Sequence, residues 1–414
     1  MLLRSCDTFV CTSLATSSSG TQGGTLFGKN ADRPSSEEHE VIRTGSRRYN
    51  EGDVVRCTYI TIPQAKQTFD CVLSKPRWMW GTAKLLPSLE IGANALGVCG
   101  GNEAVQTLLS EELLNSDGSP TKSLLGMDIL RLALERGRTA KEAVEVSITM
   151  LEKYGQGGPC CQEDKDWTYE NSYIFADSEE AYVLETAGRS HWCWERVGAG
   201  QVRNISNGIS IRSNWGGISK EIQNISRQNS WWDGVSDFDW KKAVASGGSV
   251  VGLQSYGREA AGQGHLKSIK EESDAMENPP TFEHWIKRMI DVLKDEDSGI
   301  CFRDIHGFCS TGSQISWIES PRKTRHFFTG ASDPLSGTPY KLFRFSDSPS
   351  DSDHGSNTLW DLWRQRTLSK LSLGDKVKYD LKELEDEGFS EHPSLSFADL
   401  ISREVELIEK SRHE

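Results

Sequence analysis

The first hundred residues break into short strand-like runs, and this pattern limits the fold more than any other feature of the sequence. The runs are rich in β-branched and aromatic residues and are separated by Gly, Asn and Pro; they read DTFVCTSLA, TLFGKNAD, EVIRTGS, VRCTYITIP, FDCVLSK and EIGANALGVCG. Short runs with turn residues between them favour an antiparallel sheet over βαβ units. The chain from Asp7 to about Val105 is therefore predicted to form antiparallel strands.

A helical pair follows this block. The run LLGMDILRLALERG ends at Gly137, and Thr139 with Glu142 forms a T-x-x-E capping box that opens TAKEAVEVSITMLEKYG, which stops at Gly155. One face of this second helix carries Ala140, Ala143, Val144, Ser147, Ile148 and Leu151. The second helix is thus expected to pack through this face.

A second strand block begins after the loop GQGGPCCQEDKD. NSYIFADSEEAYVLETAG reads as two alternating runs joined by a DSEE turn, which predicts a hairpin, and HWCWERV and QVRNISNGISI continue the pattern. Two strand blocks around a helix pair predict an α+β fold of two stacked antiparallel sheets with outer helices. We place a main domain at residues 6–345, a linker at 346–357 and a charged helical extension at 358–414, packed on the main domain or partly loose.

The composition excludes several classes of protein. With 36% hydrophobic and 26% charged residues and no long apolar run, no transmembrane segment is expected. A net charge of -13 without a basic stripe argues against nucleic acid as a partner. Ten dispersed cysteines without a CxxC pair are interpreted as reduced, and the leader MLLR lacks a secretory apolar region, so a cytoplasmic location is expected.

Cys6 raises the main chemical question of the sequence. A cysteine at the start of a strand is most often a small buried hydrophobe. At the start of a mature chain, however, a cysteine supplies both a thiol nucleophile and an α-amine whose ordinary pKa is about 7.7 to 8.0. That pair suits acyl transfer from an amide, provided that N–H donors stabilise the oxyanion. The two interpretations stay open on the residues alone.

Ordered motifs along the chain resemble those of a known family. They are SCDTFV, FGKNADRP, CTYI, SKPRWMWG, GANALGV, GGNEAV, LLGMD, RLALERG, EKYGQGG, VLETAG, VRNIS, SWWDG and HFFTGASDP. In this order they resemble the secernin family, in the dipeptidase-like branch of the N-terminal nucleophile hydrolases. The resemblance runs from about Cys6 to Phe345 and implies a four-layer αββα sandwich. It also implies cleavage of small peptide or acyl-amide substrates without a cofactor or metal.

The resemblance assigns roles to matching residues. It implies that Cys6 is the nucleophile, with Met1–Ser5 as a propeptide that the chain removes itself. Asp32 falls where related acylases place the aspartate that holds the α-amine. Those relatives have an arginine three residues earlier, where this sequence has Lys29, so a bidentate carboxylate clamp is lost.

Three later positions complete the implied site. Asn102 in GGNEAV and Asn207 in NISNG resemble the polar positions that line the oxyanion site, and Arg258 in SYGRE matches the later active-site arginine. As isolated residues, Asp32 could cap the GKNADRP turn by bonding its own backbone, and Asn102 and Asn207 could be turn residues beside glycines.

Two departures from the family pattern fall near Asn102. The extra segment TAKLLPSLE precedes GANALGV, and Ala95 replaces the usual Glu of GANE. We expect them either to reshape the pocket or only to lengthen a surface loop. Secernins are also linked to regulated exocytosis, so a catalytically silent binding or regulatory protein is the alternative to a hydrolase. Assembly into a homo-oligomer stays open.

Overall fold

A computed structural model of the 414-residue chain describes most of the sequence. The described residues are 6–17, 23–78, 90–246, 250–303, 307–330, 337–347, 356–369, 373–390 and 393–411, without the side chains of 250–256, 356–358 and 367–368. In this part of the chain, none of the helices is long and apolar enough to cross a membrane.

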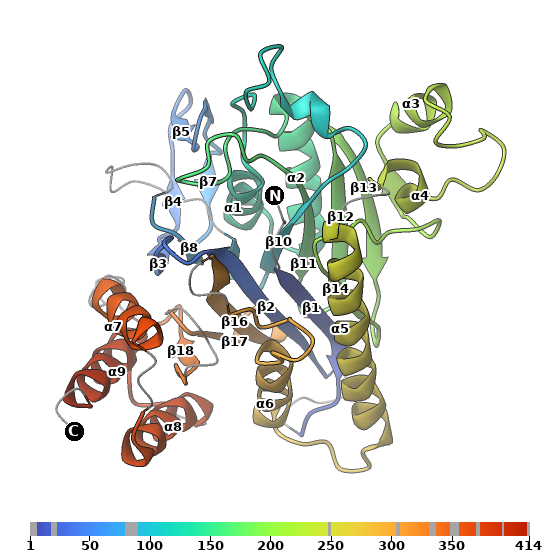
Figure 1. Ribbon diagram of the computed structural model, residues 1–414. Coiled ribbons are helices and arrows are strands. Elements are labelled where there is room, and N and C mark those ends of the chain that lie inside the picture. Colours follow the sequence, from blue (N-terminus) through green and yellow to red (C-terminus); the bar gives the residue numbers. More distant parts are fainter. Residues whose placement is uncertain are drawn as a thin grey trace.

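Two antiparallel sheets form the centre of the molecule (Figure 1). The six-stranded sheet has the order β14 (Val202–Ile205), β1 (Asp7–Leu14), β2 (Gly24–Pro34), β16 (Phe308–Ser320), β17 (Lys323–Phe328) and β18 (Lys341–Phe343). The eight-stranded sheet has the order β15 (Gly217–Ile218), β13 (His191–Val197), β12 (Ala181–Ala187), β11 (Glu170–Ala176), β10 (Cys99–Val105), β9 (Ile91–Asn94), β8 (Cys71–Pro76) and β3 (His39–Thr44). The predicted hairpin is β11–β12.

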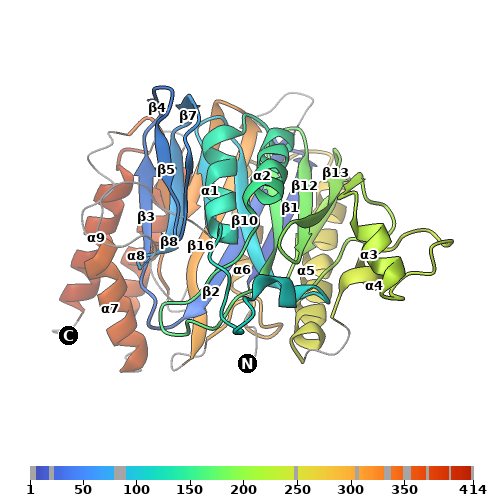
Figure 2. The same ribbon diagram turned by 90° about the horizontal axis from the view of Figure 1, so that it is seen from above.

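Helices cover the outer face of each sheet, which confirms the predicted αββα arrangement (Figure 2). On the eight-stranded sheet lie α1 (Gly126–Arg136) and α2 (Ala140–Tyr154), and on the six-stranded sheet lie α5 (Val250–Ala275) and α6 (Phe282–Leu293). The predicted ends of the helix pair are also confirmed, because α1 stops at Gly137 and the Thr139 side chain accepts from the Glu142 N–H. The Glu142 carboxylate accepts from the N–H of Arg138 rather than from that of Thr139.

Smaller elements surround this sandwich. Short helices lie at η1 (Ser110–Leu113), α3 (Ile222–Gln228) and α4 (Trp240–Val244), and two small hairpins pair β4 (Arg47–Arg48) with β7 (Gln67–Thr68) and β5 (Val54–Arg56) with β6 (Thr61–Pro63). The run VRCTYITIP, predicted as one strand, is therefore a hairpin. Its turn closes where the Cys57 N–H donates to the carbonyl of Ile60 at 2.8 Å.

Strand alternation divides the core into layers. On β1, Phe9 and Cys11 pack with α5 and α6, whereas Val10 faces the other sheet. All ten cysteines lie among the described residues, and each is buried and not part of a disulfide. Cys6 precedes Asp7 on this strand, so alternation directs its side chain toward the space between the sheets.

Three C-terminal helices close one edge of the sandwich. They are α7 (Ser356–Leu368), α8 (Asp375–Phe389) and α9 (Phe397–Lys410), and they gather beside β18 and β3 (Figure 1). A fully buried ion pair joins α9 to β18, with Lys341 Nζ 2.6 Å from Glu404 Oε2, and the indole N–H of Trp363 donates to the same carboxylate at 2.8 Å. The extension therefore packs on the main domain, while the domain boundaries themselves stay a prediction.

Glu170 at the start of β11 should make stability depend on pH. Its buried carboxylate accepts from Thr107, Ser110 and the Gly188 N–H, yet burial raises its pKa from 4.5 to about 7. The folded state thus holds the proton more tightly than the unfolded state. This stabilisation, up to about 3 kcal/mol, is complete below pH 4.5 and is lost as pH rises through 7.

The Glu170→Gln variant removes this titration. We expect its unfolding free energy, measured in urea at pH 5 and pH 8, to fall less over that interval than the wild-type value does. Glu111→Gln, at an exposed position of η1, is the control and should keep the wild-type slope. An unchanged slope in Glu170→Gln would contradict the prediction.

Candidate active site

Strand register brings Cys6 beside residues distant in the sequence. In β1, Asp7 pairs with Asn30 of β2 and Thr8 with Ile205 of β14, both antiparallel. The residue before Asp7 therefore lies against the end of β2 at Asp32 and against the chain that leaves β14 at Asn207. Central strands thus hold the candidate nucleophile, which is only 7% exposed.

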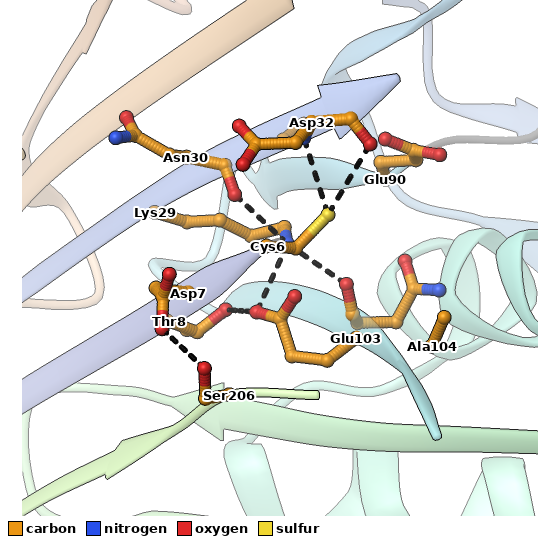
Figure 3. A network of polar contacts seen from close by, with 12 residues as sticks. Cys6, Asp7, Thr8, Lys29, Asn30, Asp32, Glu90, Glu103, Ala104 and Ser206 are labelled. Atoms are coloured by element: carbon orange, nitrogen blue, oxygen red, sulfur yellow. Dashed lines mark hydrogen bonds and ion pairs between the residues drawn. The ribbon is translucent and has the colours of Figure 1, made fainter. Parts of the chain in front are cut away.

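The Cys6 sulfur is held by the main chain of Asp32 (Figure 3). The Asp32 N–H donates to Sγ at 3.2 Å, and Sγ lies 3.7 Å from the Asp32 carbonyl oxygen. Burial raises the pKa of the Cys6 thiol well above its ordinary value; the Lys29 ammonium opposes this rise, and Glu103, Glu90 and Asp32 add to it. The thiol is thus protonated at neutral pH unless a base removes its proton.

The nitrogen of Cys6 has a separate partner in Asn207. It donates to Asn207 Oδ1 at 2.9 Å, and Arg258 Nη2 donates to the same oxygen at 2.7 Å. Asn207 Nδ2 donates to the carbonyl of Ala104 at 2.9 Å. Because a guanidinium only donates and a carbonyl only accepts, these contacts fix which way the Asn207 amide points.

Arg258 comes from the helical layer, on α5, and is buried. Its Nε donates to Asp7 Oδ2 at 3.1 Å, while Ser206 Oγ donates to Asp7 Oδ1 at 2.6 Å. Burial raises the pKa of Asp7, an effect that Arg258 and then Ser206 oppose. Arg258 therefore links Asp7, which follows Cys6 in the chain, to Asn207, which accepts from the Cys6 nitrogen.

The Asp32 carboxylate is positioned by the neighbouring strand β16. Ser310 pairs with Asp32 in the ladder, and its Oγ donates to Asp32 Oδ1 at 2.6 Å. Asp32 therefore contributes its main chain to the thiol and has its carboxylate oriented by Ser310.

A buried ion pair lies on the other side of Cys6 (Figure 3). Lys29 Nζ donates to Glu103 Oε1 at 3.0 Å and to the carbonyl oxygens of Asn102 at 2.8 Å and Asn30 at 3.4 Å. Thr8 Oγ1 donates to the same Glu103 oxygen. These three acceptors match the three N–H groups of the ammonium, so Lys29 serves as a fixed internal charge rather than as a ligand for a substrate carboxylate.

Asn102 presents its main chain to the site, whereas its side chain points away. It pairs with Tyr173 of β11, whose ring packs with α1 and α2, and Asn102 Nδ2 donates to Asn171 Oδ1 at 2.9 Å. The next residue, Glu103, faces the other sheet. The Asn102 N–H donates to the Glu90 carbonyl only at 3.4 Å, while its carbonyl accepts from Lys29.

The structure thus joins Cys6, Asp32, Asn207 and Arg258 directly, and Asn102 through Lys29. The residues that motif matching missed are Asp7, Glu103, Ser206 and Ser310. Asp7 and Glu103 are sequence neighbours of the predicted positions in SCDTFV and GGNEAV. In both motifs the available sequence signal was an acidic residue directly after the predicted one. Strand register was needed to show that this acid is buried in the site.

Other predicted features lie further from Cys6 or outside the described residues. Met1–Ser5 and most of the extra segment, 79–89, lie outside them. Ala95 lies in the β9–β10 turn and lines a cavity of about 530 Å³ together with residues of β17 and β18. Among the described residues, no group of three His, Cys, Asp or Glu could hold a metal ion.

The model of peptidase family C69 matches residues 11–295. Among solved structures, a mutant of conjugated bile acid hydrolase from Clostridium perfringens is 11% identical over 83% of this chain and 95% of that one, with a TM-score of 0.44. The N-acylethanolamine-hydrolyzing acid amidase ortholog of Caenorhabditis elegans is 11% identical over 77% and 94%, with a TM-score of 0.38.

Proposed function

The chain belongs to peptidase family C69, a family of peptidases with a cysteine nucleophile, and from this premise we propose that it is a secernin-type N-terminal nucleophile hydrolase. Its substrates would be small peptides or acyl amides, as in a dipeptidase. The observation that carries the proposal is the convergence on one residue of two separate sets of contacts. One set holds the Cys6 sulfur, through Asp32, and the other holds the Cys6 nitrogen, through Asn207.

Maturation is the first proposed reaction. The Cys6 thiol attacks the carbonyl carbon of Ser5 and the Ser5–Cys6 C–N bond breaks, while the thiol proton passes to the leaving Cys6 nitrogen and a thioester forms between Ser5 and the Cys6 sulfur. Water then hydrolyses the resulting thioester, which releases residues 1–5 and leaves a free α-amine on Cys6. Asn207 Oδ1 would keep its contact with this nitrogen, and Asp32 would hold the amine as its counter-charge.

Substrate hydrolysis is the second proposed reaction. The free α-amine removes the thiol proton, the thiolate attacks the substrate carbonyl, and the leaving amine departs with the proton that the α-amine had taken. Water, deprotonated by the α-amine, then hydrolyses the thioester, which releases the acid and returns the proton to the Cys6 thiol. The oxyanion would receive the second N–H of Asn207 Nδ2 and the main-chain N–H of Asn102. The buried Lys29–Glu103 pair and the Arg258–Asp7 pair would hold these donors in place without touching substrate.

A panel of dipeptides and acyl amides tests this proposal. We expect turnover with kcat/KM rising as the α-amine loses its proton, at about pH 7.7 to 8.0 for an ordinary amine. Intact-mass measurement after quenching should show an acyl group on Cys6. Purified protein that begins at Cys6 but neither turns over any member of the panel nor becomes acylated would contradict the hydrolase.

A second candidate function is a binding or regulatory protein in exocytosis whose catalytic parts are silent. The burial of the Cys6 thiol and its raised pKa favour it, because such a thiol is not activated in the chain as synthesised. A protein that keeps residues 1–5 and shows no turnover would support this candidate.

A further inference from the structure

A cavity of about 530 Å³ lies at the opposite end of the six-stranded sheet from Cys6. On β16, Ser310 contacts Asp32 of the candidate site, whereas Trp317 lines the cavity roughly 20 Å further along the strand. Figure 1 shows β17 and β18, which also line it, beside the C-terminal helices. We propose that this space, which we call the anion cavity, binds a small organic anion with at least two carboxylate or phosphate groups. The inference does not depend on the hydrolase proposed above.

The anion cavity lies where β17 and β18 stop pairing. Their ladder ends at the pair His326–Phe343, although β17 begins three residues earlier. Residues 323–325 and 344–346 continue beyond this last pair, and both segments line the cavity. Ala95, in the β9–β10 turn of the other sheet, lines it as well. Segments far apart in the sequence therefore surround one space.

The charge of the cavity lining is opposite to that of the chain as a whole. The basic residues that line it are Arg322, Lys323, Arg325 and Arg344, and among the described lining residues only Glu319 is acidic. Glu319 already forms an ion pair with Lys323. The whole chain, by contrast, carries a net charge of -13. Because positive charge gathered in a hollow attracts anions, this lining favours a negatively charged ligand.

Arg344 is fixed in the cavity wall by the C-terminal extension. Its Nε donates to Asp347 Oδ1 at 3.0 Å, its Nη1 to the Pro393 carbonyl at 2.7 Å and its Nη2 to the Leu395 carbonyl at 3.0 Å. Asp347 offsets part of the charge, but these contacts use only three of the five N–H groups of a guanidinium. Two N–H groups therefore have no partner among the described residues. A side chain held in this way need not be ordered again when an anion binds.

His326 adds a buried donor to the same lining. Gln314 Nε2 donates to Ser316 Oγ at 2.8 Å, so the Ser316 hydroxyl gives its own hydrogen to His326 Nδ1, also at 2.8 Å. Burial lowers the pKa of His326 to about 3, so its ring is neutral and carries its hydrogen on Nε2. This buried Nε2 has no hydrogen-bond partner among the described residues. An oxygen of a bound anion would accept from it and remove the cost of an unpaired donor.

The apolar part of the lining and the size of the cavity favour an organic ligand. Trp317, Leu342 and Phe343 line the cavity and are buried. Charges beside such side chains act through a medium of lower dielectric constant than water, which strengthens their attraction for an anion. The volume of about 530 Å³ lies within the range of about 300–1,000 Å³ that is usual for small-molecule sites, and it exceeds what an inorganic ion needs.

Calorimetric titration of the full chain at constant ionic strength tests the proposal. Citrate presents carboxylates and methylenediphosphonate presents phosphate-like groups, so the two probes show which group the cavity prefers. We expect saturable binding of at least one of them, and at least about ten-fold weaker binding of acetate. Ala95→Glu should weaken binding of the preferred probe at least about ten-fold, because it adds a negative charge to the wall. Ala95→Gln adds the same bulk without the charge and should stay within about three-fold of wild type.

Arg322→Gln serves if Ala95→Glu does not fold, and it should weaken binding at least about three-fold. Lys141→Gln is its control, because Lys141 is also an exposed cation but lies on α2. In protein with nitrogen-labelled histidine, the NMR signal of His326 Nε2 should shift as the probe saturates. The inference is overturned if neither probe binds the wild type saturably, or if the Ala95→Glu and Ala95→Gln variants bind equally. Binding that leaves the His326 signal unchanged places the anion elsewhere and also overturns it.

Discussion

The Cys6→Ala variant is expected to retain Met1–Ser5, whereas the wild-type chain begins at Cys6. The reason is that the proposed cleavage uses the Cys6 thiol of the same chain, so a methyl group leaves the Ser5–Cys6 bond without a nucleophile. Turnover should also fall by roughly 10³-fold or more, as for other enzymes that lose their nucleophile. The mass of the first proteolytic peptide reports the cleavage, and kcat/KM on the best substrate reports the turnover.

Cys11→Ala is the control for this experiment. Cys11 lies on the same strand and is also fully buried, but it packs among apolar residues toward α5 and α6. This variant should lose some stability but still begin at Cys6. If the wild type keeps residues 1–5, or if Cys6→Ala loses them equally well, self-cleavage is wrong.

The second large effect is expected from Lys29→Met. The substitution leaves Glu103 buried between the sheets without its cation, and breaking a buried pair in this way typically costs about 3–5 kcal/mol. Burial raises the pKa of Glu103 from 4.5 to about 8 even with Lys29 opposing the rise, so without Lys29 the folded pKa lies higher still. In the Lys29→Met variant the folded Glu103 carboxyl is then neutral below pH 8. The stability that comes from holding this proton in the folded state is lost as pH rises. Urea unfolding should therefore show a larger loss at pH 9 than at pH 6.

The double variant Lys29→Met/Glu103→Gln provides the matched comparison. It removes the stranded carboxylate while keeping a side chain that can accept from Thr8. We expect it to recover most of the stability that Lys29→Met loses at pH 9. Equal instability of the single and double variants at that pH would show that Lys29 stabilises the fold by packing rather than by charge.

The parts of the fold that the sequence predicted correctly are those marked by short-range sequence signals. Gly137, Thr139 and Gly155 mark helix ends through backbone geometry and capping, which depend on a few neighbouring residues, and all three were correctly interpreted. The prediction of one strand for the run VRCTYITIP was wrong. Its apolar pattern is compatible with either one strand or a tight hairpin, so the local signal could not distinguish them.

The roles of the candidate site residues stay a prediction, and the sequence pointed to the residues but not to their geometry. The motifs led to Cys6, Asp32, Asn207 and Arg258, which do meet. That Glu103 rather than the Asn102 side chain faces the thiol follows from the pairing of β10 with β11 and from the packing of one sheet on the other. Such facts depend on long-range register, which one sequence does not encode in any local pattern.

The central place of β2, between β1 and β16, has a consequence for how the protein is made. Asp32 and the Ser310 that orients its carboxylate are 278 residues apart. At the usual 5–20 residues per second of synthesis, roughly 15–55 s pass before the second strand leaves the ribosome. During that time the first two strands of the nascent chain have no β16 to pair with, and the surroundings of Cys6 are incomplete. Under the proposed self-cleavage, the N-terminal leader would outlast translation of most of the chain, and its removal would report that nearly the whole polypeptide has been completed.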